Sequence, residues 1–345
     1  MPLIQVIEME NPLLELRNIT KEFPIGGGLG LGEKKSIKAV DNVSFGVSRE
    51  KPTILALVGE SGSGKTTISR IILGLLDPTS GEILYEGRDV RNWIKKDRTA
   101  YRRNVQVIFQ DPYGIYNPFY RVDRVLFKSV KKFGLASSSE EANNMVVESM
   151  RAMGMRPEDL LGRYPHQLSG GERQRLMLVR ILLIKPKLVI ADEPVSMIDV
   201  SLRSIFLNNL HDLRSRLKMS TIYITHDLNI AHYISDEIMV LCYGRIVETG
   251  ETKSVVKNPL HPYTQGLVNA IPIPNPRKRW KDTIEIEEVT FRKLQTQRHR
   301  CIYSHRCPHV MPVCKELIPP LMEIKPGRRA ACFLHPEVLE AAKSQ

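Results

Sequence analysis

The order of apolar and polar residues along this chain predicts buried strands that alternate with helices. Apolar, β-prone residues dominate four short stretches, at residues 53–58, 105–110, 187–193 and 221–226, as is typical of strands buried in a sheet. Between residue 111 and about residue 168 the apolar residues recur at helical spacing, which indicates a helical insert. Strands that alternate with helices are typical of an α/β fold.

Further strands are expected on either side of these stretches. Residues 13–19 and 39–47 alternate like edge strands, and residues 80–88 read as a short strand between turns. A closing hairpin is expected at residues 238–248. The glycine-rich segment 24–32 lacks a following Lys-Ser/Thr pair, so we expect only a flexible hairpin tip there.

An octet directly after the first buried strand fits a phosphate-binding loop. Residues 59–66 read Gly-Glu-Ser-Gly-Ser-Gly-Lys-Thr, which matches the pattern of Gly, four residues, Gly, Lys and Ser or Thr. A helix is expected to follow, so backbone N–H groups and the helix N-terminus should converge on phosphate. Lys65 would then hold the β- and γ-phosphates and Thr66 would ligate Mg²⁺; a glycine-rich turn that binds nothing is the alternative. The residues expected to bind ATP in this segment are Gly59, Ser61, Gly62, Ser63, Gly64, Lys65, Thr66 and Thr67.

Polar residues are expected where buried strands end, which is where ligands of open α/β sheets gather. One buried strand ends in Asp192 and Glu193, and another ends in His226. We expect Asp192 to reach Mg²⁺, directly or through water, and Glu193 to orient or deprotonate an attacking water. His226 could contact the γ-phosphate or that water. A solvated turn and a structural histidine are the alternatives. Phe23, near a strand end, is a candidate platform for stacking adenine, although an aromatic residue there is more often part of the core.

A second anion site is indicated at residues 168–175, which read Leu-Ser-Gly-Gly-Glu-Arg-Gln-Arg. Ser169 and two glycines open a helix there, so free N–H groups and the positive helix end should face outward. Ser-Gly-Gly before a helix is by itself a common start signal, whereas the full octet is far more specific.

Charge and composition limit the partners and the location. The formal net charge is +12, and residues 271–345 hold 14 Lys and Arg against 8 Asp and Glu, which is half of the excess. An anionic membrane surface would attract this basic region, although a solvated basic face is the more frequent reading. No aromatic-interleaved basic patch accompanies the charge, so we expect no nucleic-acid partner. No run of about eighteen apolar residues and no secretory signal pattern occurs, so the protein is expected in the cytosol.

Late cysteines indicate a metal site. Five, six and seventeen residues separate four of the five cysteines, Cys301, Cys307, Cys314 and Cys332. Disulfides are not expected in a reducing cytosol, and structural zinc usually shows close Cys-x-x-Cys pairs. Four thiolates without such pairing suit an iron–sulfur cluster, with a structural role, held by a proline-rich loop. Zinc is the second interpretation, and unligated or redox-active thiols are the third.

Together these motifs resemble the nucleotide-binding subunit of an ABC transporter, over residues 13–250. The motifs that carry the resemblance, in the family's order, are Gly59–Thr66, Gln110, Leu168–Arg175, Leu188–Glu193, Ser196–Asp199 and His226. One departure is Ser196-Met-Ile-Asp199, where the family usually has Ser-Ala-Leu-Asp. The substituted residues remain apolar. The resemblance implies an α/β fold of P-loop NTPase type, with a helical insert, an antiparallel β edge and a small Cys-rich C-terminal appendage.

The resemblance also implies how ATP is used. Two such subunits would sandwich two ATP molecules, each site combining one chain's phosphate loop with the other chain's signature. The signature residues implied to serve the partner's ATP are Ser169, Gly170, Gly171 and Glu172. Gln110 would bind Mg²⁺ and sense nucleotide, Asp199 would lie in the D-loop, and residues 111–119 would receive the coupling helix of a membrane partner. Glu193 is implied as the general base and His226 as its γ-phosphate-sensing companion, so hydrolysis is expected.

The end of the chain refines this placement. Residues 258–272 resemble the ending of oligopeptide/dipeptide importer ATPases, some of which bind a [4Fe–4S] cluster through a cysteine-rich tail. This branch implies a heterodimer with a second ATPase subunit, two membrane permeases and an extracytoplasmic solute-binding protein, at the cytoplasmic face of the cell membrane. In some lineages the same branch carries oligosaccharides or metal chelates, so the resemblance does not name the cargo.

The resemblance also sets the expected domains and the alternatives. We expect a nucleotide-binding core at residues 1–110 and 186–270, a helical signature subdomain at 111–185, and a basic, Cys-rich C-terminal domain at 271–345. The alternative functions are a non-transport ABC ATPase that acts on nucleic acid or ribosomes, and a non-hydrolysing partner.

Overall fold

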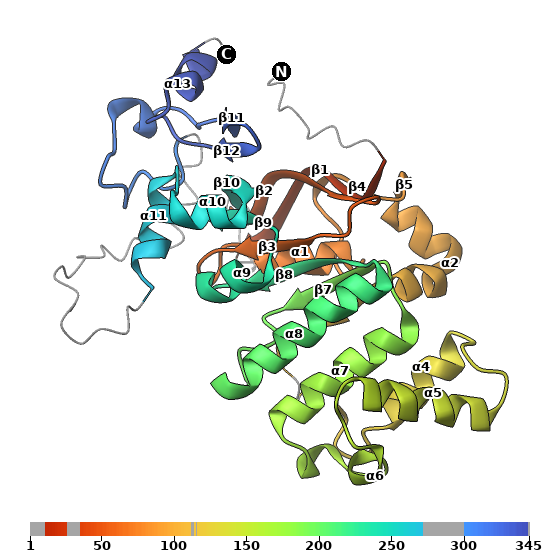
Figure 1. Ribbon diagram of the computed structural model, residues 1–345. Helices are drawn as coiled ribbons and strands as arrows, with labels where there is room; N and C mark the ends of the chain where they lie inside the picture. Colours follow the sequence, from red (N-terminus) through yellow and green to blue (C-terminus); the bar gives the residue numbers. More distant parts are fainter. Residues whose placement is uncertain (1–10, 26–34, 112–113, 115, 272–299, 344–345) are drawn as a thin grey trace, which may run out of the picture. The chain divides into compact units, whose positions relative to one another are not determined.

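The computed structural model, whose helices and strands are labelled in Figure 1, divides into two compact units. It describes residues 11–25, 35–111, 114, 116–271 and 300–343. Unit 1 comprises Met1–Val47, Leu55–Gly87 and Thr225–Gln345, and unit 2 comprises Ser48–Ile54 and Arg88–Ile224. The domain boundaries expected from the sequence were placed by the order of the motifs, whereas these two units are defined by contacts within the structure. Those boundaries therefore remain a prediction.

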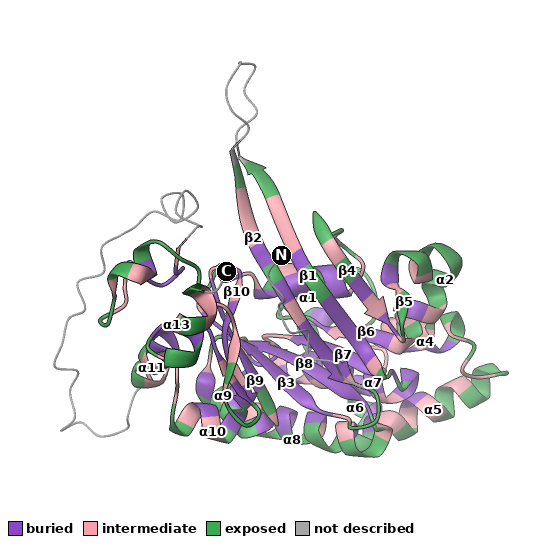
Figure 2. Cartoon of the chain, turned by 90° about the horizontal axis from the view of Figure 1, so that it is seen from above, coloured by how far each residue is buried: buried purple, intermediate pink, exposed green. Residues whose placement is uncertain are grey.

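The strands of unit 1 form two hydrogen-bonded groups, one that contains β1 and one that contains β9. β1 lies between β2 and β4 and is antiparallel to β4. Elsewhere the order is β11-β12-β10-β9-β3, in which β3 is parallel to β9 and the other pairs are antiparallel. The bounds are β1 (Pro12–Ile25), β2 (Lys35–Ser48), β3 (Ile54–Val58), β4 (Ser80–Tyr85), β9 (Glu237–Cys242), β10 (Arg245–Glu251), β11 (Met322–Lys325) and β12 (Arg328–Ala330). Every residue of β3 is buried, as its uninterrupted apolar sequence predicts (Figure 2).

The helices of unit 1 begin at clear local signals. Asp227 caps α9 by accepting the N–H groups of Asn229 and Ile230. α11 starts with Pro262 after the capping residue His261. The bounds are α1 (Lys65–Ile72), α9 (Leu228–Ile234), α10 (Thr252–Lys257), α11 (Pro262–Asn269), the 3₁₀ turn η2 (Pro312–Lys315) and α13 (Pro336–Lys343).

The cysteine-rich segment shares the apolar core of unit 1. Ala56 and Val58 of β3 belong to the same buried cluster as Cys301, Tyr303 and Phe333. The cysteine-rich segment and the strand that leads into the predicted phosphate loop therefore contribute to one hydrophobic core. Of the glycine-rich segment predicted at residues 24–32, residues 26–32 lie outside the described residues.

Unit 2 is built on three neighbouring parallel strands, in the order β8-β7-β6, within its described residues. Val105 lies opposite Leu188, and Leu188 lies opposite Ser220, so the three strands are in register and end together. Their bounds are β6 (Val105–Ile108), β7 (Leu188–Asp192) and β8 (Ser220–Thr225). The carboxyl ends of these strands bring the predicted polar residues to one edge of the sheet.

Helices make up most of the rest of unit 2. The helical spacing predicted between residues 111 and 168 is confirmed by α4 and α5, both of which pack on α7. α2, which was not among the predicted elements, is capped by Asp89 and is interrupted by non-helical backbone at Asp97. The bounds are β5 (Arg88–Asp89), α2 (Val90–Asn104), α4 (Arg124–Lys132), α5 (Ser139–Ala152), α6 (Pro157–Leu160), the 3₁₀ turn η1 (Pro165–Gln167), α7 (Gly170–Ile184) and α8 (Val200–Leu217). None of the described helices is long and apolar enough to cross a membrane.

Candidate functional site

The predicted phosphate loop connects β3 to α1 in unit 1, with two glycines in left-handed backbone conformations. Gly62 has φ +78° and Gly64, the residue before α1, has φ +107°. A Cβ atom at Gly64 would overlap the carbonyl oxygen of Ala39, and one at Gly59 would overlap that of Leu241. Gly64 offers no side chain to cap α1, so the first turn presents its backbone N–H groups to a ligand. The loop therefore has the geometry of an anion cradle.

Lys65 is folded back into its own loop and is almost completely buried, with 5% exposure. Its Nζ donates to the carbonyl oxygens of Gly59, at 2.7 Å, and Glu60, at 2.8 Å. The hydroxyl of Ser63 lies 3.3 Å from the same ammonium. Thr66 is exposed and Thr67 half-buried at the start of α1. Bound phosphate would offer the Lys65 ammonium charged oxygens in place of neutral carbonyls.

Glu60, which was not among the predicted site residues, connects the loop to the C-terminal part of unit 1. Its N–H donates to the hydroxyl of Tyr263 at 2.9 Å. Its carboxylate accepts two bonds from the Arg306 guanidinium, at 2.9 and 3.1 Å. The bond with Glu60 raises the pKa of Arg306, although partial burial opposes the rise. Tyr263 and Arg306 lie about two hundred residues or more from Glu60 in the chain, so no local sequence pattern could predict these contacts.

In unit 2, the side chains of Gln110 and Glu193 meet at the ends of neighbouring parallel strands. The Gln110 amide donates to the Glu193 carboxylate at 3.2 Å. Glu193 follows the half-buried Asp192, and its N–H donates to Ile224 of β8 at 2.9 Å. The φ of Glu193 is +43°, an unfavourable conformation for a residue with a side chain. Such strained backbone clusters at functional sites.

The predicted signature opens α7 with a reciprocal cap. The Ser169 hydroxyl accepts the N–H of Glu172, while the Glu172 carboxylate accepts both the N–H and the hydroxyl of Ser169. Gly170 is the first residue of the helix. At Gly171 a Cβ atom would lie 2.9 Å from the Leu202 side chain, so α8 approaches α7 closely there. Gln174, fully buried on α7, donates to the Phe109 carbonyl, next to Gln110.

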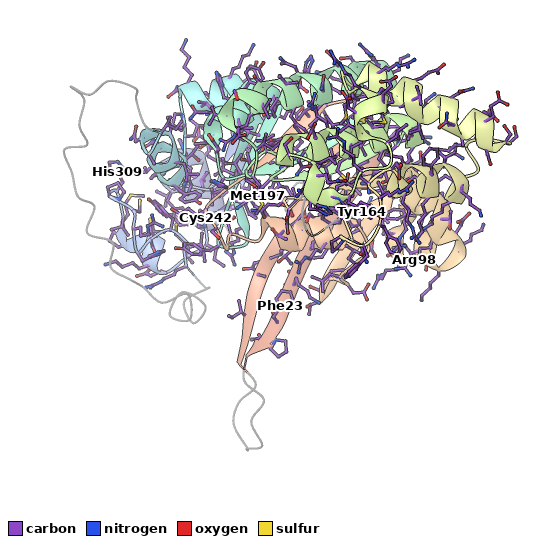
Figure 3. All side chains as sticks on the ribbon, turned by 90° about the horizontal axis from the view of Figure 1, so that it is seen from below. Phe23, Arg98, Tyr164, Met197, Cys242 and His309 are labelled. Carbon is purple, nitrogen blue, oxygen red and sulfur yellow. The ribbon has the colours of Figure 1, made fainter. Side chains whose placement is uncertain are left out.

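The remaining predicted residues lie at element ends. His226 is exposed directly after β8, and Asp199 is exposed directly before α8. Phe23 is 38% exposed near the outer end of β1, with the Lys21 ammonium 5.4 Å from its ring centre (Figure 3). Lys65, Phe23 and His226 belong to unit 1, whereas Gln110, the carboxylates and the signature belong to unit 2. The ATP-binding and catalytic roles of these residues stay predictions.

The four late cysteines line one small pocket of unit 1. Cys301, Cys307, Cys314 and Cys332 contribute to its wall, and the N–H of Cys301 donates to the carbonyl of Cys314 at 3.0 Å. Burial raises the pKa of Cys301 to about 12 and that of Cys332 to about 11. The five cysteines form no disulfide. Among the described residues no group of three or more His, Cys, Asp and Glu side chains is arranged to hold a metal ion. The ligand geometry of the predicted iron–sulfur cluster is thus unsupported.

Two family models match the chain. The ABC transporter model matches residues 40–196, which include the phosphate loop, Gln110, the signature and the paired carboxylates. The model of the oligopeptide/dipeptide transporter C-terminal region matches residues 247–314, which include α11 and three of the late cysteines. Cys332 lies beyond that match.

Known proteins agree with both family matches. Oligopeptide transport ATP-binding protein AppF of Bacillus subtilis is 36% identical over 94% of this chain and 98% of its own length. The solved dimer of the ATP-binding cassette MJ0796, in a post-hydrolysis state with ADP and Pi, is 26% identical and has a TM-score of 0.59 over 69% of this chain and 98% of its own. The solved structure of cbiO1 from Clostridium perfringens, 23% identical, covers 72% of this chain and 92% of its own with the same TM-score, and supports the fold. The chain therefore belongs to the ABC transporter family of ATP-binding proteins, in the group that carries the oligopeptide/dipeptide transporter C-terminal region.

Proposed function

We propose that this chain is the ATP-hydrolysing motor subunit of a peptide importer. One observation carries the assignment: a single chain joins an ABC transporter segment at residues 40–196 to an oligopeptide/dipeptide transporter C-terminal region at 247–314. Similarity to AppF over nearly the full length of both chains supports it. Peptides are the proposed cargo, and oligosaccharides or metal chelates are the alternatives within the branch.

The phosphate loop binds the nucleotide in this proposal. Lys65 exchanges the carbonyl oxygens of Gly59 and Glu60 for the β- and γ-phosphates, while the N–H groups of the first turn of α1 bind the same anion. The hydroxyl of Thr66 and the oxygens of Gln110 and Asp192 are the proposed ligands of Mg²⁺. When bound, Mg²⁺ neutralises charge on the β- and γ-phosphates. Phe23 stacks on adenine.

Hydrolysis is assigned to the carboxyl ends of the parallel strands. Glu193 accepts a proton from the attacking water, and Gln110, 3.2 Å away, holds that carboxylate in place. His226 senses the γ-phosphate. The strained φ of Glu193 is consistent with a side chain held for chemistry rather than for packing.

A second subunit completes each ATP site. We assign the Ser169–Glu172 signature to the partner's nucleotide, as the resemblance to ABC ATPases implies, and its helix N-terminus and glycines suit an anion. Asp199 lies at the same dimer interface. The dimeric solved structure of MJ0796 supports a two-subunit assembly. We propose a heterodimer with a homologous subunit, bound to two permeases at the cytoplasmic face of the membrane and supplied by a solute-binding protein.

The cysteine pocket is the proposed site of a [4Fe–4S] cluster, with zinc as the alternative. Four cysteine residues that line one pocket are a donor set that suits both groups, although their side chains would have to turn to ligate either one. The cluster would hold the C-terminal segment on unit 1. Iron, sulfide and zinc analysis of anaerobically purified protein tests this: iron and sulfide in equal amounts support the cluster, and zinc alone or no metal contradicts it.

Uptake measurements test the importer assignment. Deleting the gene should abolish accumulation of labelled di- and oligopeptides, and the wild-type gene should restore it. Genes carrying Lys65→Ala or Glu193→Gln should not restore accumulation, even when the variant proteins are present at wild-type levels. Undiminished uptake, together with ATP hydrolysis stimulated by nucleic acid, would contradict the importer and favour the non-transport alternative.

A further inference from the structure

Glu60, the second residue of the phosphate loop, is held from three directions. Its carbonyl oxygen accepts a bond from the Lys65 ammonium, its N–H donates to the Tyr263 hydroxyl, and its carboxylate pairs with Arg306. The first contact belongs to the loop itself. The other two come from residues more than two hundred positions away in the chain.

The pair between Glu60 and Arg306 is well defined. Two hydrogen bonds, of 2.9 and 3.1 Å, join the guanidinium and the carboxylate in a fork, which fixes direction as well as distance. The Arg306 and Glu60 side chains are 26% and 38% exposed, so water only partly screens the pair. Arg306 also interacts electrostatically with Tyr243, the residue after β9, and lies 5.9 Å from the ring centre of Tyr303. These contacts restrict movement of the guanidinium away from the Glu60 carboxylate.

Both outside contacts of Glu60 lead to the cysteine-rich segment. Arg306 directly precedes Cys307 in the chain. Tyr303, two residues after Cys301, packs edge-on against Tyr263 with ring centres 5.3 Å apart. The segment that carries the cysteines therefore touches Glu60 directly through Arg306 and indirectly through Tyr263.

We propose that Arg306 is a positioning residue for the ATP site. By holding the Glu60 side chain, it fixes the Glu60 peptide group, whose carbonyl helps to hold the Lys65 ammonium that the phosphates must take over. ATP affinity then depends on the conformation of the cysteine-rich segment. The inference rests on the ATP site of the proposed function but needs no metal, and its readout is separate from peptide uptake.

Equilibrium ATP binding to the purified full-length chain tests the role of Arg306. Arg306→Ala should weaken ATP binding at least fivefold, and Arg306→Lys should weaken it less because lysine keeps the charge but loses the two-pronged geometry. Glu60→Ala should weaken it to the same extent as Arg306→Ala. The double variant should be no weaker than either single variant, because both changes remove one interaction. Arg300→Ala, in the same segment but not among the contacts of Glu60, is the matched control and should bind ATP within twofold of wild type.

One further comparison separates positioning from folding. The exchanged pair, Glu60→Arg with Arg306→Glu, should recover part of the lost affinity, which a general loss of structure would not allow. The proposal is overturned if folded Arg306→Ala and Arg306→Lys proteins bind ATP within twofold of wild type, or if Arg300→Ala causes an equal loss. If the Arg306 variants bind ATP with unchanged affinity but peptide uptake is lost, this inference is wrong and the importer assignment is unaffected.

Discussion

Arg328 of β12 and Glu248 of β10 form an ion pair withdrawn from solvent. The guanidinium lies 2.8 Å from the carboxylate, and the two side chains are 8% and 0% exposed. Glu248 also accepts the N–H groups of Leu260 and His261, both at 2.9 Å, and Arg328 donates to the carbonyl of Asn258 at 2.7 Å. One buried pair therefore joins the strands of the C-terminal segment to the chain that leads into α11.

Replacing Arg328 should destabilise unit 1 strongly. Arg328→Met leaves the Glu248 carboxylate buried without its cation, which typically costs about 3 to 5 kcal/mol. The free energy of unfolding from urea titration measures the loss. Arg329→Ala, one residue along the same strand and half-buried, should change it by less than about 1 kcal/mol. Equal losses in the two variants would contradict the role of the pair.

Acid should destabilise the protein through His261. Burial, and secondarily the nearby His335, lowers the pKa of His261 to about 3, while its Nδ1 accepts the N–H of Tyr263 at the start of α11. An unfolded histidine has a pKa of about 6.5, so between these values the unfolded chain binds a proton that the folded chain excludes. The stability contribution is complete above about pH 6.5 and is lost as the pH falls towards 3, by about 2 kcal/mol between pH 7 and pH 5.

Asparagine at position 261 separates titration from capping. His261→Asn keeps an acceptor suited to a helix start but does not titrate. Its free energy of unfolding should therefore fall less steeply than that of wild type between pH 7 and pH 5. His211→Asn, at an exposed position on α8, should leave the wild-type slope unchanged. A His261→Asn protein with the wild-type slope would show that other groups carry the pH dependence.

The sequence predicted the parts of the site that depend on neighbouring residues. The strand, loop and helix around Lys65 are local, and the glycines that shape the loop belong to the motif itself. Gln110 and Glu193 could be expected to meet because parallel strands end at one edge, and their side chains do meet. Glu60 and Arg306 lie 246 residues apart in the chain, and no pattern in either segment predicts a contact between them. Distant side-chain pairs follow from packing, which one sequence does not display.

The spacing of the late cysteines likewise predicted only part of what the structure shows. Spacing indicated that the four late cysteines would gather, and they do line one pocket. Spacing could not supply the orientation of each thiol, which depends on the turns between them and on whatever occupies the pocket.

Two loop glycines should respond differently to alanine. At Gly62 an added methyl group would meet open space and only the φ is unfavourable, so Gly62→Ala should lower the free energy of unfolding by about 1 to 2 kcal/mol. At Gly59 the methyl group would overlap the carbonyl oxygen of Leu241 and lie 2.8 Å from Ser63 Oγ, so the loop and the end of β9 must move apart. Gly59→Ala should therefore cost about 3 kcal/mol, the upper end of the usual cost of overpacking. Urea titration of both variants measures the difference, and a smaller loss at Gly59 than at Gly62 would contradict the loop geometry.

Removing the charge of Glu193 should separate ATP binding from hydrolysis. Glu193→Gln keeps the size of the side chain and can still meet the Gln110 amide, but it cannot accept a proton from water. General-base catalysis typically contributes about 10² to 10⁴ in rate, so steady-state phosphate release should fall at least about a hundredfold. ATP affinity should stay within about threefold of wild type, because Lys65 and the loop N–H groups are unchanged. Lys65→Ala is the complementary control and should lose ATP binding itself. A Glu193→Gln protein that hydrolyses ATP at more than a tenth of the wild-type rate would exclude Glu193 as the base.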